Sequence, residues 1–296
     1  MTEKSRRNVP ELAEVERRVG VLLEALPYIR EFAGATIVIK YGGAAMTAPE
    51  LKASFARDVA LLKLVGMHPV VVHGGGPDIS RYSDRLGLEV RFVHGLRVTD
   101  APTMELVKMV LVGKINKEIV AQLQVAGVSA VGLAGDDGGL IRAEKAEHDD
   151  ADLGFVGRVE QIDASVLERL WDFVPVVASV GVGPDGQSYN INADTVAGAL
   201  ARALRARKVI FLTDVEGVYH DFQDKGSLIS ECSRADVEAM IASGTAGSGM
   251  IPKLKAVADA LRGGVEAAHI VDGRVPHSVL MELFTQDGVG TKVVQA

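Results

Sequence analysis

The sequence predicts an α/β fold in which an open, mostly parallel sheet lies between helices. Three segments, 37–39, 70–72 and 209–212, are apolar throughout, as expected for strands buried on both faces. Helix-like segments separate them along the chain, and this alternation is typical of parallel sheets. Because ligands of such sheets bind beyond the carboxyl ends of the strands, we expect the chemistry in the loops that follow the strands.

From residue 36 onward the predicted elements alternate in order. We expect helices at 49–65, 77–86, 101–126, 192–205 and 251–262, and strands at 36–40, 68–73, 129–135, 173–180, 208–215 and 267–273. The segments GGLIRAEK (138–145) and FVGRVEQID (155–163) lie on either side of a polar EHDDAD and predict a hairpin. A boundary near 178–183 would divide the chain into two halves, each able to hold one substrate.

A helix is predicted ahead of the first strand, over residues 11–32. Its apolar residues recur three, four and seven positions apart, namely Leu12, Val15, Val19, Leu22, Leu23 and Leu26. Pro10 suits its first turn, and Pro27 predicts a kink because proline removes a helical hydrogen bond. The pattern alone fits packing on the chain's own domain or on another subunit.

Composition narrows the class of protein. The chain has 296 residues, 48% of them hydrophobic, and a formal charge of −7, which does not favour nucleic-acid binding. A single cysteine, Cys232, allows no internal disulfide. There is no apolar run of about 18 residues and no apolar signal-peptide core at the N-terminus. We therefore expect a cytoplasmic protein without a membrane partner.

Glycines follow several of the predicted strands. The strongest cluster is HGGGP (73–77), in which Pro77 pre-sets a helix start and the helix N-terminus offers N–H groups to an anion. A plain strand-to-helix turn would need fewer glycines. GVGPDG (181–186) matches GxGxxG formally, but Pro184-Asp185-Gly186 predicts a reverse turn rather than a dinucleotide site.

A few cations lie where a surface charge is unexpected. Lys40 directly follows a buried strand, and Lys253 follows Pro252 at a helix start, where a cation is unfavourable unless an anion binds there. Arg97 lies in HGLRVTD (94–100), whose Thr99 or Asp100 could cap the next helix. The alternative for each cation is a solvated surface position.

The segment YNINAD (189–194) supplies polar side chains before a predicted helix. Asn192 or Asp194 is expected to cap this helix, which leaves Asn190 available for a substrate. Asp194 could lie between two lysines and keep both charged. The histidines are not spaced as metal ligands, and HDDAD (148–152) fits a solvated hairpin tip, so we predict no protein-held metal.

These motifs together resemble a known family. IVIKYGG (37–43), HGGGPDI (73–79), GLRVTD (95–100), YNINADTVAGALA (189–201), FLTDVEGVY (211–219) and SGMIPKL (248–254) occur in the order and at the spacing of the amino-acid kinase superfamily. Within it they are similar to the acetylglutamate kinase family. The likeness covers residues 36–294. Ala44 and Asp136 depart from the family's usual Asn and Lys.

The resemblance implies ATP-dependent phosphorylation of the γ-carboxylate of N-acetyl-L-glutamate in arginine biosynthesis. It implies an N-terminal oligomerisation helix (1–34), a lobe for acetylglutamate and dimerisation (35–180) and a lobe for ATP and an effector (181–296). Lys40, Lys253 and Asp194 would be catalytic, and Gly75, Gly76, Arg97 and Asn190 would bind the substrate. The nucleotide would contact Gly43, Leu212, Thr213, Asp214, Val215, Glu216, Gly217, Gly249, Met250 and Ile251. Mg²⁺ would arrive bound to ATP, and a carboxylate nucleophile needs no general base at neutral pH.

The N-terminal helix resembles that of arginine-inhibited, hexameric family members, which are trimers of dimers. Tyr28, His269, Glu282 and Gly288 match their arginine site, so arginine is expected as a feedback inhibitor. A PII-type regulatory partner is left open by the sequence. Because the sequence ends at Ala296, we expect no acetyltransferase domain of the kind that some relatives carry.

Two alternatives remain at this point. The chain could be another kinase of the superfamily, acting on glutamate, aspartate, carbamate or a nucleoside monophosphate. It could also be a catalytically idle arginine sensor with the same fold.

Overall fold

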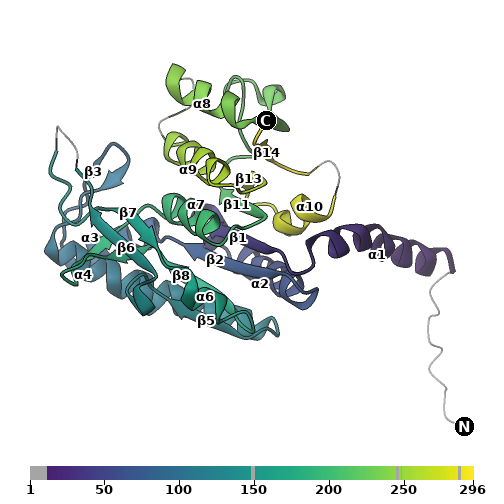
Figure 1. Ribbon diagram of the computed structural model, residues 1–296, viewed down its shortest axis with the longest axis horizontal. Helices are drawn as coiled ribbons and strands as arrows, with labels where there is room; N and C mark the ends of the chain where they lie inside the picture. Colours follow the sequence, from purple (N-terminus) through teal and green to yellow (C-terminus); the bar gives the residue numbers. More distant parts are fainter. Residues whose placement is uncertain (1–11, 148–150, 245–246, 248, 286–287) are drawn as a thin grey trace, which may run out of the picture.

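A large twisted sheet with helices on both faces forms the body of the molecule (Figure 1). The structure is a computed structural model that describes residues 12–147, 151–244, 247, 249–285 and 288–296. The order of the strands in this sheet is β12-β14-β13-β11-β1-β2-β8-β5. Their bounds are β1 Thr36–Tyr41, β2 His68–His73, β5 Ala130–Leu133, β8 Val174–Ala178, β11 Lys208–Thr213, β12 Glu231–Ser233, β13 Ala267–Asp272 and β14 Thr291–Val294. All neighbouring pairs are parallel except β13 and β14, which confirms the predicted fold class.

A smaller sheet has the order β10-β9-β6-β7, and its strands are β6 Ile141–Lys145, β7 Gly157–Ile162, β9 Val180–Val182 and β10 Ser188–Asn190. The antiparallel pairing of β6 with β7 confirms the predicted hairpin. The antiparallel pairing of β9 with β10 makes GVGPDG part of a hairpin turn, as predicted, and not a dinucleotide loop. A two-stranded hairpin of β3 Phe92–Val93 and β4 Leu96–Arg97 lies apart from both sheets.

Helices predicted from the sequence are present with shifts of one or two residues at their ends. They are α2 Pro49–Leu64, α3 Gly76–Leu86, α7 Ala193–Ala203 and α9 Ile251–Arg262. Several helical elements were not predicted, namely α6 Ser165–Glu168, α8 Arg234–Ser243, α10 Ser278–Phe284 and the short 3-10 turns η1 Gly43–Met46, η3 Asp137–Gly139 and η4 Lys225–Ser227.

The segment 101–126 differs from the single α-helix predicted for it. It begins as α4 Ala101–Lys108, continues as the π-helix η2 Met109–Ile115 and ends as α5 Asn116–Val125. The wider winding of η2 turns Leu111 and Ile115 toward Gly75, where a Cβ atom would lie 2.7 Å from Leu111 and 2.3 Å from Ile115. The π-helical stretch is short and lies inside a longer helical segment, as is usual for such turns, and the sequence prediction did not separate it from the helices on either side.

Helix α1, Leu12–Phe32, extends away from the body of the molecule (Figure 1). Pro27 lies inside this helix without ending it. The helix contacts the body through α10. Its outward apolar residues Leu12, Val15, Val19, Leu23 and Leu26 are exposed.

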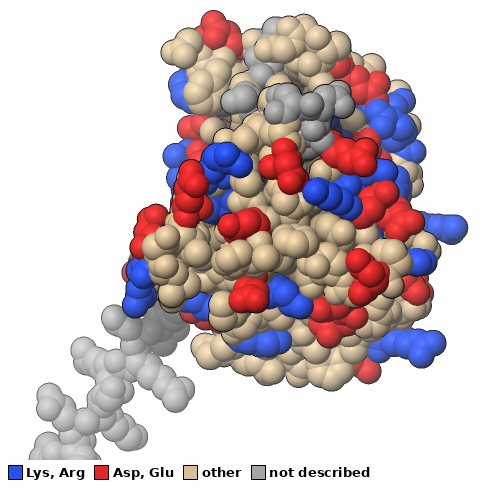
Figure 2. Space-filling view, turned by 90° about the vertical axis from the view of Figure 1, so that its left-hand side faces the viewer, with Lys and Arg blue, Asp and Glu red and all other residues tan. Residues whose placement is uncertain are grey.

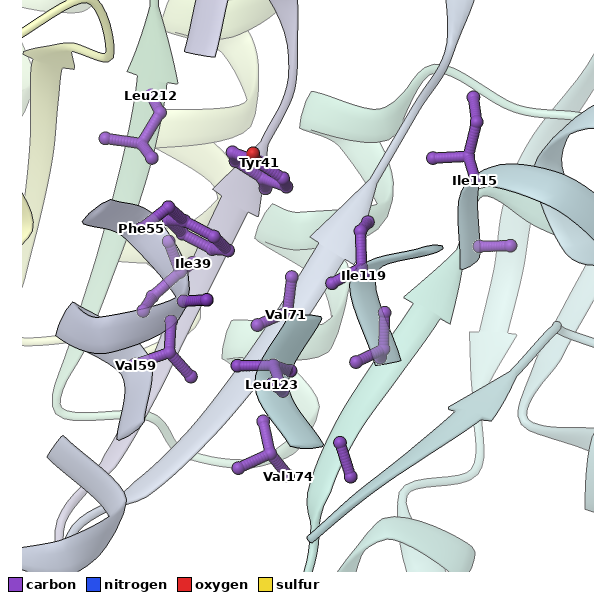
Figure 3. Packing of buried hydrophobic residues seen from close by; sticks show 14 of the residues in the cluster. Ile39, Tyr41, Phe55, Val59, Val71, Ile115, Ile119, Leu123, Val174 and Leu212 are labelled. Atoms are coloured by element: carbon purple, nitrogen blue, oxygen red, sulfur yellow. The ribbon is translucent and has the colours of Figure 1, made fainter. Parts of the chain in front are cut away.

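The core has one layer on each face of the sheet, and the alternation of side chains along a strand assigns residues to the layers. On β1, Ile37, Ile39 and Tyr41 belong to the layer that includes α2 and α5, and Tyr41 stacks on Phe55 of α2 with ring centroids 3.8 Å apart (Figure 3). Val38 belongs to the opposite layer, with α7 and α9. Lys40 has the parity of Val38, so its side chain is directed toward α7 and α9.

The surface shows no broad area of one charge on the face drawn in Figure 2, where acidic and basic side chains are interspersed. None of the helices in the described ranges is both long and apolar enough to cross a bilayer.

Candidate active site

A buried carboxylate holds two lysines at the carboxyl edge of the large sheet. Lys40 lies near the end of β1, Asp194 in the first turn of α7 and Lys253 in the first turn of α9. The Nζ atoms of Lys40 and Lys253 lie 3.2 and 3.0 Å from the same oxygen, Oδ1 of Asp194. Asn192 caps α7 by accepting from the backbone N–H groups of Asp194 and Thr195. The three charged groups that the sequence singled out are therefore brought together.

The charge balance of this cluster favours an anionic ligand. Burial alone would raise the pKa of Asp194, but Lys40 and Lys253 outweigh it and the pKa is lowered. Burial lowers the pKa of Lys253, opposed by Asp194. One carboxylate thus faces two ammonium groups, and the uncompensated positive charge matches an anion such as a phosphoryl group.

The three glycines of HGGGP and the start of α3 form one wall of a cavity of about 220 Å³ next to this cluster. Gly75 is the N-cap of α3, so the free N–H groups of the first helical turn lie at the cavity. Lys40, Gly43 and Asp194 line the same cavity. This arrangement combines helix N–H groups with two ammonium groups around one small space, as expected for anion binding.

Arg97 and Asn190 line the other side of this cavity. Arg97 Nη2 donates to the carbonyl oxygen of Gly76 at 2.9 Å and to Ser80 Oγ at 2.7 Å. Its Nη1 is buried without a hydrogen-bond partner among the described residues, and an unsatisfied guanidinium donor of this kind favours an anionic partner such as a carboxylate. Asn190 Nδ2 donates to Thr99 Oγ1 at 3.1 Å. Of the two residues predicted as possible caps of the next helix, Thr99 and Asp100, it is Asp100 that forms the N-cap of α4.

A second cavity, of about 480 Å³, lies beyond Lys253 on the side of β11 and α8. Six of the residues expected to contact the nucleotide line it, namely Thr213, Asp214, Val215, Gly217, Gly249 and Met250. Leu212 is buried and lines a different, small cavity. Glu216 instead accepts a hydrogen bond from Tyr219 at 2.7 Å, and Ile251 begins α9 and is partly buried. Gly43 lines the first cavity instead.

Sequence reasoning missed several residues at these two cavities. Tyr219, Phe222 and Met240 line the larger cavity, and Ser80 and Thr99 orient Arg97 and Asn190. The only sequence signal for Tyr219 was its place at the end of the FLTDVEGVY segment. Phe222 and Met240 belong to segments without a predicted role.

A family model described as "Amino acid kinase family" matches residues 35–272. The chain belongs to the amino acid kinase family. It is 58% identical to an acetylglutamate kinase of Symbiobacterium thermophilum over 94% of this chain and 98% of that protein. It is 54% identical to an acetylglutamate kinase of Heliobacterium modesticaldum, again over 94% of this chain and 98% of that protein. These relatives place the chain among the acetylglutamate kinases and confirm the predicted enzyme class.

A solved structure has the same fold as this amino acid kinase. It is the N-acetylglutamate synthase of Neisseria gonorrhoeae, described as complexed with coenzyme A and N-acetyl-glutamate, with a TM-score of 0.84 and 25% identity. The match covers 94% of this chain and 63% of that one, so the kinase chain spans less than two thirds of the synthase. The likeness supports the fold class read from the strand order.

The kinase also has a cavity of about 660 Å³ near the amino ends of β11 and β13. All four residues expected at an effector site line it: Tyr28, His269, Glu282 and Gly288. His269 Nδ1 lies 2.6 Å from Glu282 Oε1, and the backbone N–H of Val289 donates to Glu282 Oε2 at 2.8 Å. Burial lowers the pKa of His269, although Glu282 opposes this, so the imidazole is neutral at neutral pH.

Within the described ranges, no group of three acidic, histidine or cysteine side chains is arranged to hold a metal ion. Asp152, from the predicted hairpin tip, pairs with Lys145 at 3.0 Å; Asp149 and Asp150 lie outside the described residues. Asp194 is already held by two lysines.

Proposed function

We propose that this kinase transfers the γ-phosphoryl group of ATP to the γ-carboxylate of N-acetyl-L-glutamate, forming N-acetyl-L-glutamyl 5-phosphate in the cytoplasmic pathway to arginine. One observation supports this most: at the sheet edge Asp194 fixes two lysines, one of which lines the smaller cavity and the other the larger one. Lys40 lines the smaller cavity and Lys253 the larger. A group that passes between the two cavities passes the two ammonium groups.

The acceptor substrate fits the smaller cavity. Nη1 of Arg97, which has no partner in the described part of the chain, would bind the α-carboxylate of acetylglutamate. Asn190 would bind the acetamido end, and Gly75 and Gly76 would receive the γ-carboxylate and the transferring group. A guanidinium matches a carboxylate in a planar, bidentate geometry that lysine does not reproduce.

The chemistry of the acceptor requires little from the protein beyond position and charge. A γ-carboxylate has a pKa of about 4.3 and is already ionised at neutral pH, so no general base is needed. Phosphoryl transfer is accelerated mainly by alignment and by stabilisation of charge on the transferring group. Lys40, Lys253 and the N–H groups at the start of α3 would supply that stabilisation, and Asp194 would hold both lysines in place.

ATP would occupy the larger cavity, with residues 213–217 and 249–251 around it. The cavity suits the nucleotide because it combines the apolar Val215, Phe222 and Met240 with Lys253 at its inner end. Mg²⁺ would enter with the phosphates, which neutralises part of their charge. Residues 35–180 would then form the acetylglutamate lobe and residues 181–296 the ATP lobe.

Release of ADP in a coupled assay tests this assignment. Turnover should require acetylglutamate, and free glutamate, aspartate, carbamate and nucleoside monophosphates should give little. A preference for free glutamate would refute the substrate assignment. No turnover with any of these acceptors would favour an idle sensor.

Inhibition by arginine and assembly into a hexamer are part of the proposal. Arginine would bind in the cavity lined by Tyr28, His269, Glu282 and Gly288, where its guanidinium would pair with Glu282. The apolar stripe on the projecting helix α1 is exposed, and a second copy of the chain would cover it. A PII-type regulator is a further candidate partner.

Deletion of residues 1–30 tests the role of α1. The deletion should reduce the oligomer to dimers in light scattering and weaken inhibition by arginine. An unchanged oligomer with an unchanged arginine response would contradict this part of the proposal.

A further inference from the structure

His73 is a fully buried imidazole next to the glycine loop of the active site. It is the last residue of β2 and is 0% exposed. Its Nδ1 lies 3.0 Å from the carbonyl oxygen of Gly74, and its Nε2 lies 3.2 Å from Nδ2 of Asn116. Both ring nitrogens therefore have a partner, one in the glycine loop and one at the start of α5.

The partners of Asn116 determine which ring nitrogen carries the proton. Asn116 Nδ2 lies 2.8 Å from the carbonyl oxygen of Val176, which can only accept a hydrogen bond. That atom is therefore the donating amide nitrogen. Its second hydrogen lies between His73 Nε2 at 3.2 Å and, more weakly, the carbonyl oxygen of Leu133 at 3.4 Å, and an amide nitrogen cannot accept a hydrogen bond from the ring. Because Nε2 accepts, Nδ1 carries the proton and donates to the oxygen of Gly74.

The ring keeps this tautomer at neutral pH. Burial lowers the pKa of His73 to about 4, although the hydrogen bond to Gly74 opposes the shift. The neutral form therefore predominates wherever the enzyme works, and the direction of the hydrogen bond to Gly74 does not change.

The hydrogen bond to Gly74 sets the direction of the next N–H group. The carbonyl of Gly74 and the N–H of Gly75 belong to the same peptide unit, which is trans because the described chain has no cis peptide bonds. In a trans unit the two groups point in opposite directions. Since the carbonyl points to the buried imidazole, the N–H of Gly75 points away from it, toward the cavity that residues 74–76 line.

A run of three glycines would not hold this orientation by itself, because glycine has few conformational restraints. The neighbouring atoms leave space for the hydrogen-bonded residues His73, Asn116 and Gly74 and for no larger side chains. A Cβ atom at Gly132 of β5 would lie 1.7 Å from Oδ1 of Asn116. On the other side of the loop, Leu111 and Ile115 of the π-helix η2 close on Gly75, and π-helical turns are frequent at functional sites.

We propose that His73, oriented by Asn116, is a positioning residue that holds the Gly74–Gly75 peptide so that the N–H of Gly75 faces the transferring phosphoryl group. The inference rests on the proposed function, which gives that N–H its role. His73 does not touch the substrate and takes no part in proton transfer. Its effect is on how well the site fits the transition state rather than on how tightly it binds the substrates.

Three single variants of the full-length enzyme and one double variant test the role of His73 and Asn116. His73→Leu keeps volume but removes the donor, and it should lower kcat by about 10- to 100-fold, below the loss measured for removing an oxyanion donor outright. The KM of acetylglutamate should stay within about threefold. His73→Asn keeps a donor near the position of Nδ1 and should recover most of the rate. Asn116→Leu should lower kcat similarly, and the double variant should lose no more than His73→Leu alone.

A merely structural role would give a different result. In that case His73→Leu and His73→Asn would lose rate equally, in proportion to their loss of thermal stability, and the proposed role would be refuted. Unchanged kcat in a folded His73→Leu variant would refute it too. Turnover by the unsubstituted enzyme, measured first, separates these outcomes from a failure of the proposed function, because the comparison uses whichever acceptor that enzyme phosphorylates.

The tautomer can be measured in the unsubstituted enzyme, so the proposal does not depend on a variant that folds. Long-range ¹H–¹⁵N NMR of the His73 ring should show a proton on Nδ1 and a bare Nε2, unchanged between pH 6 and pH 8. A proton on Nε2 would overturn the proposal, because Nδ1 would no longer donate to Gly74.

Discussion

Two buried carboxylates lie toward opposite edges of the same three strands, β1, β11 and β13, and they differ in what they leave unpaired. At the carboxyl edge, Asp194 faces Lys40 and Lys253 through a single oxygen, so positive charge is in excess. Toward the amino edge, Glu282 is held by a neutral imidazole and a backbone N–H, so its negative charge is retained. The arrangement around Asp194 suits an anionic group that is being transferred. The arrangement around Glu282 suits a cationic ligand that binds without reacting.

The difference also concerns rigidity. Lys40 and Lys253 come from two different elements and share one acceptor, so movement of α9 relative to β1 changes the distance between them. Glu282 and Gly288 lie close together in the chain, and a Cβ at Gly288 would lie 2.9 Å from Glu282 Oε2. The cluster of Lys40, Asp194 and Lys253 therefore depends on the position of one half of the sheet relative to the other. The contact between Glu282 and Gly288 is instead formed within one segment of the chain.

The largest expected effect is at the carboxyl edge. Lys40→Ala should lower kcat by roughly two to four orders of magnitude, because it removes a mostly buried positive charge that would stabilise the transferring group. Initial rates at saturating ATP and acetylglutamate measure the effect. Lys255→Ala, two residues beyond Lys253 on α9 and exposed, is the matched control and should stay within about threefold. Equal rates for Lys40→Ala and the control would remove Lys40 from the site.

A smaller effect is expected at the amino edge. Glu282→Gln should raise the arginine concentration needed for half inhibition by about 10- to 100-fold, because a hydrogen bond to a charged group contributes about 1.5–3 kcal/mol. Inhibition curves measure it. Glu266→Gln is the control, since Glu266 pairs with Arg207 at the surface, and its curve should be unchanged. An unaltered curve for Glu282→Gln would place arginine elsewhere.

The smallest expected effect is on stability against pH. The pKa of His269 is lowered by burial. Below about pH 6.5 this histidine is therefore protonated in the unfolded chain but not in the folded protein. Because the unfolded state then binds more protons, stability is lost as the pH falls. From pH 6.5 to 5 this amounts to at most about 2 kcal/mol. The pKa of Asp194 is lowered as well, but a carboxylate with a lowered pKa loses its contribution only below about pH 4.

Urea denaturation between pH 7 and pH 5 separates the two edges. The free energy of unfolding should fall less steeply for His269→Gln than for the unsubstituted protein. For Asp194→Asn the slope should match the unsubstituted protein, whatever its absolute stability. A parallel slope for His269→Gln would contradict a neutral His269 in the folded state.

Much of the large sheet and of the candidate active site could be predicted from the sequence, for reasons that are visible in the structure. Continuous apolar runs located β1, β2, β8, β11 and β13, and the glycines and cations after them located the carboxyl edge. The same reasoning missed what depends on contacts between distant segments. The tautomer of His73 depends on Asn116, and the orientation of Arg97 depends on Ser80. Neither Asn116 nor Ser80 is marked by a local pattern.

Some elements were missed because their sequence signal is weak. Helix α10 begins after His277, which has a positive φ of 62°, an unusual conformation for a residue other than glycine. The π-helix η2 is a short stretch between two α-helices, so only the structure shows that its Leu111 and Ile115 close on Gly75. In both cases tertiary packing decides the backbone.

The pairing of β1 with β11 has a mechanical consequence. The strands that carry the acceptor side and those that carry the nucleotide side form one hydrogen-bonded sheet, without a separating hinge. If the lobes approach each other during turnover, the sheet must deform elastically by twisting between β1 and β11. Closure would then be opposed by elastic restoring force, and the site would reopen as soon as the bound phosphates stop holding it shut.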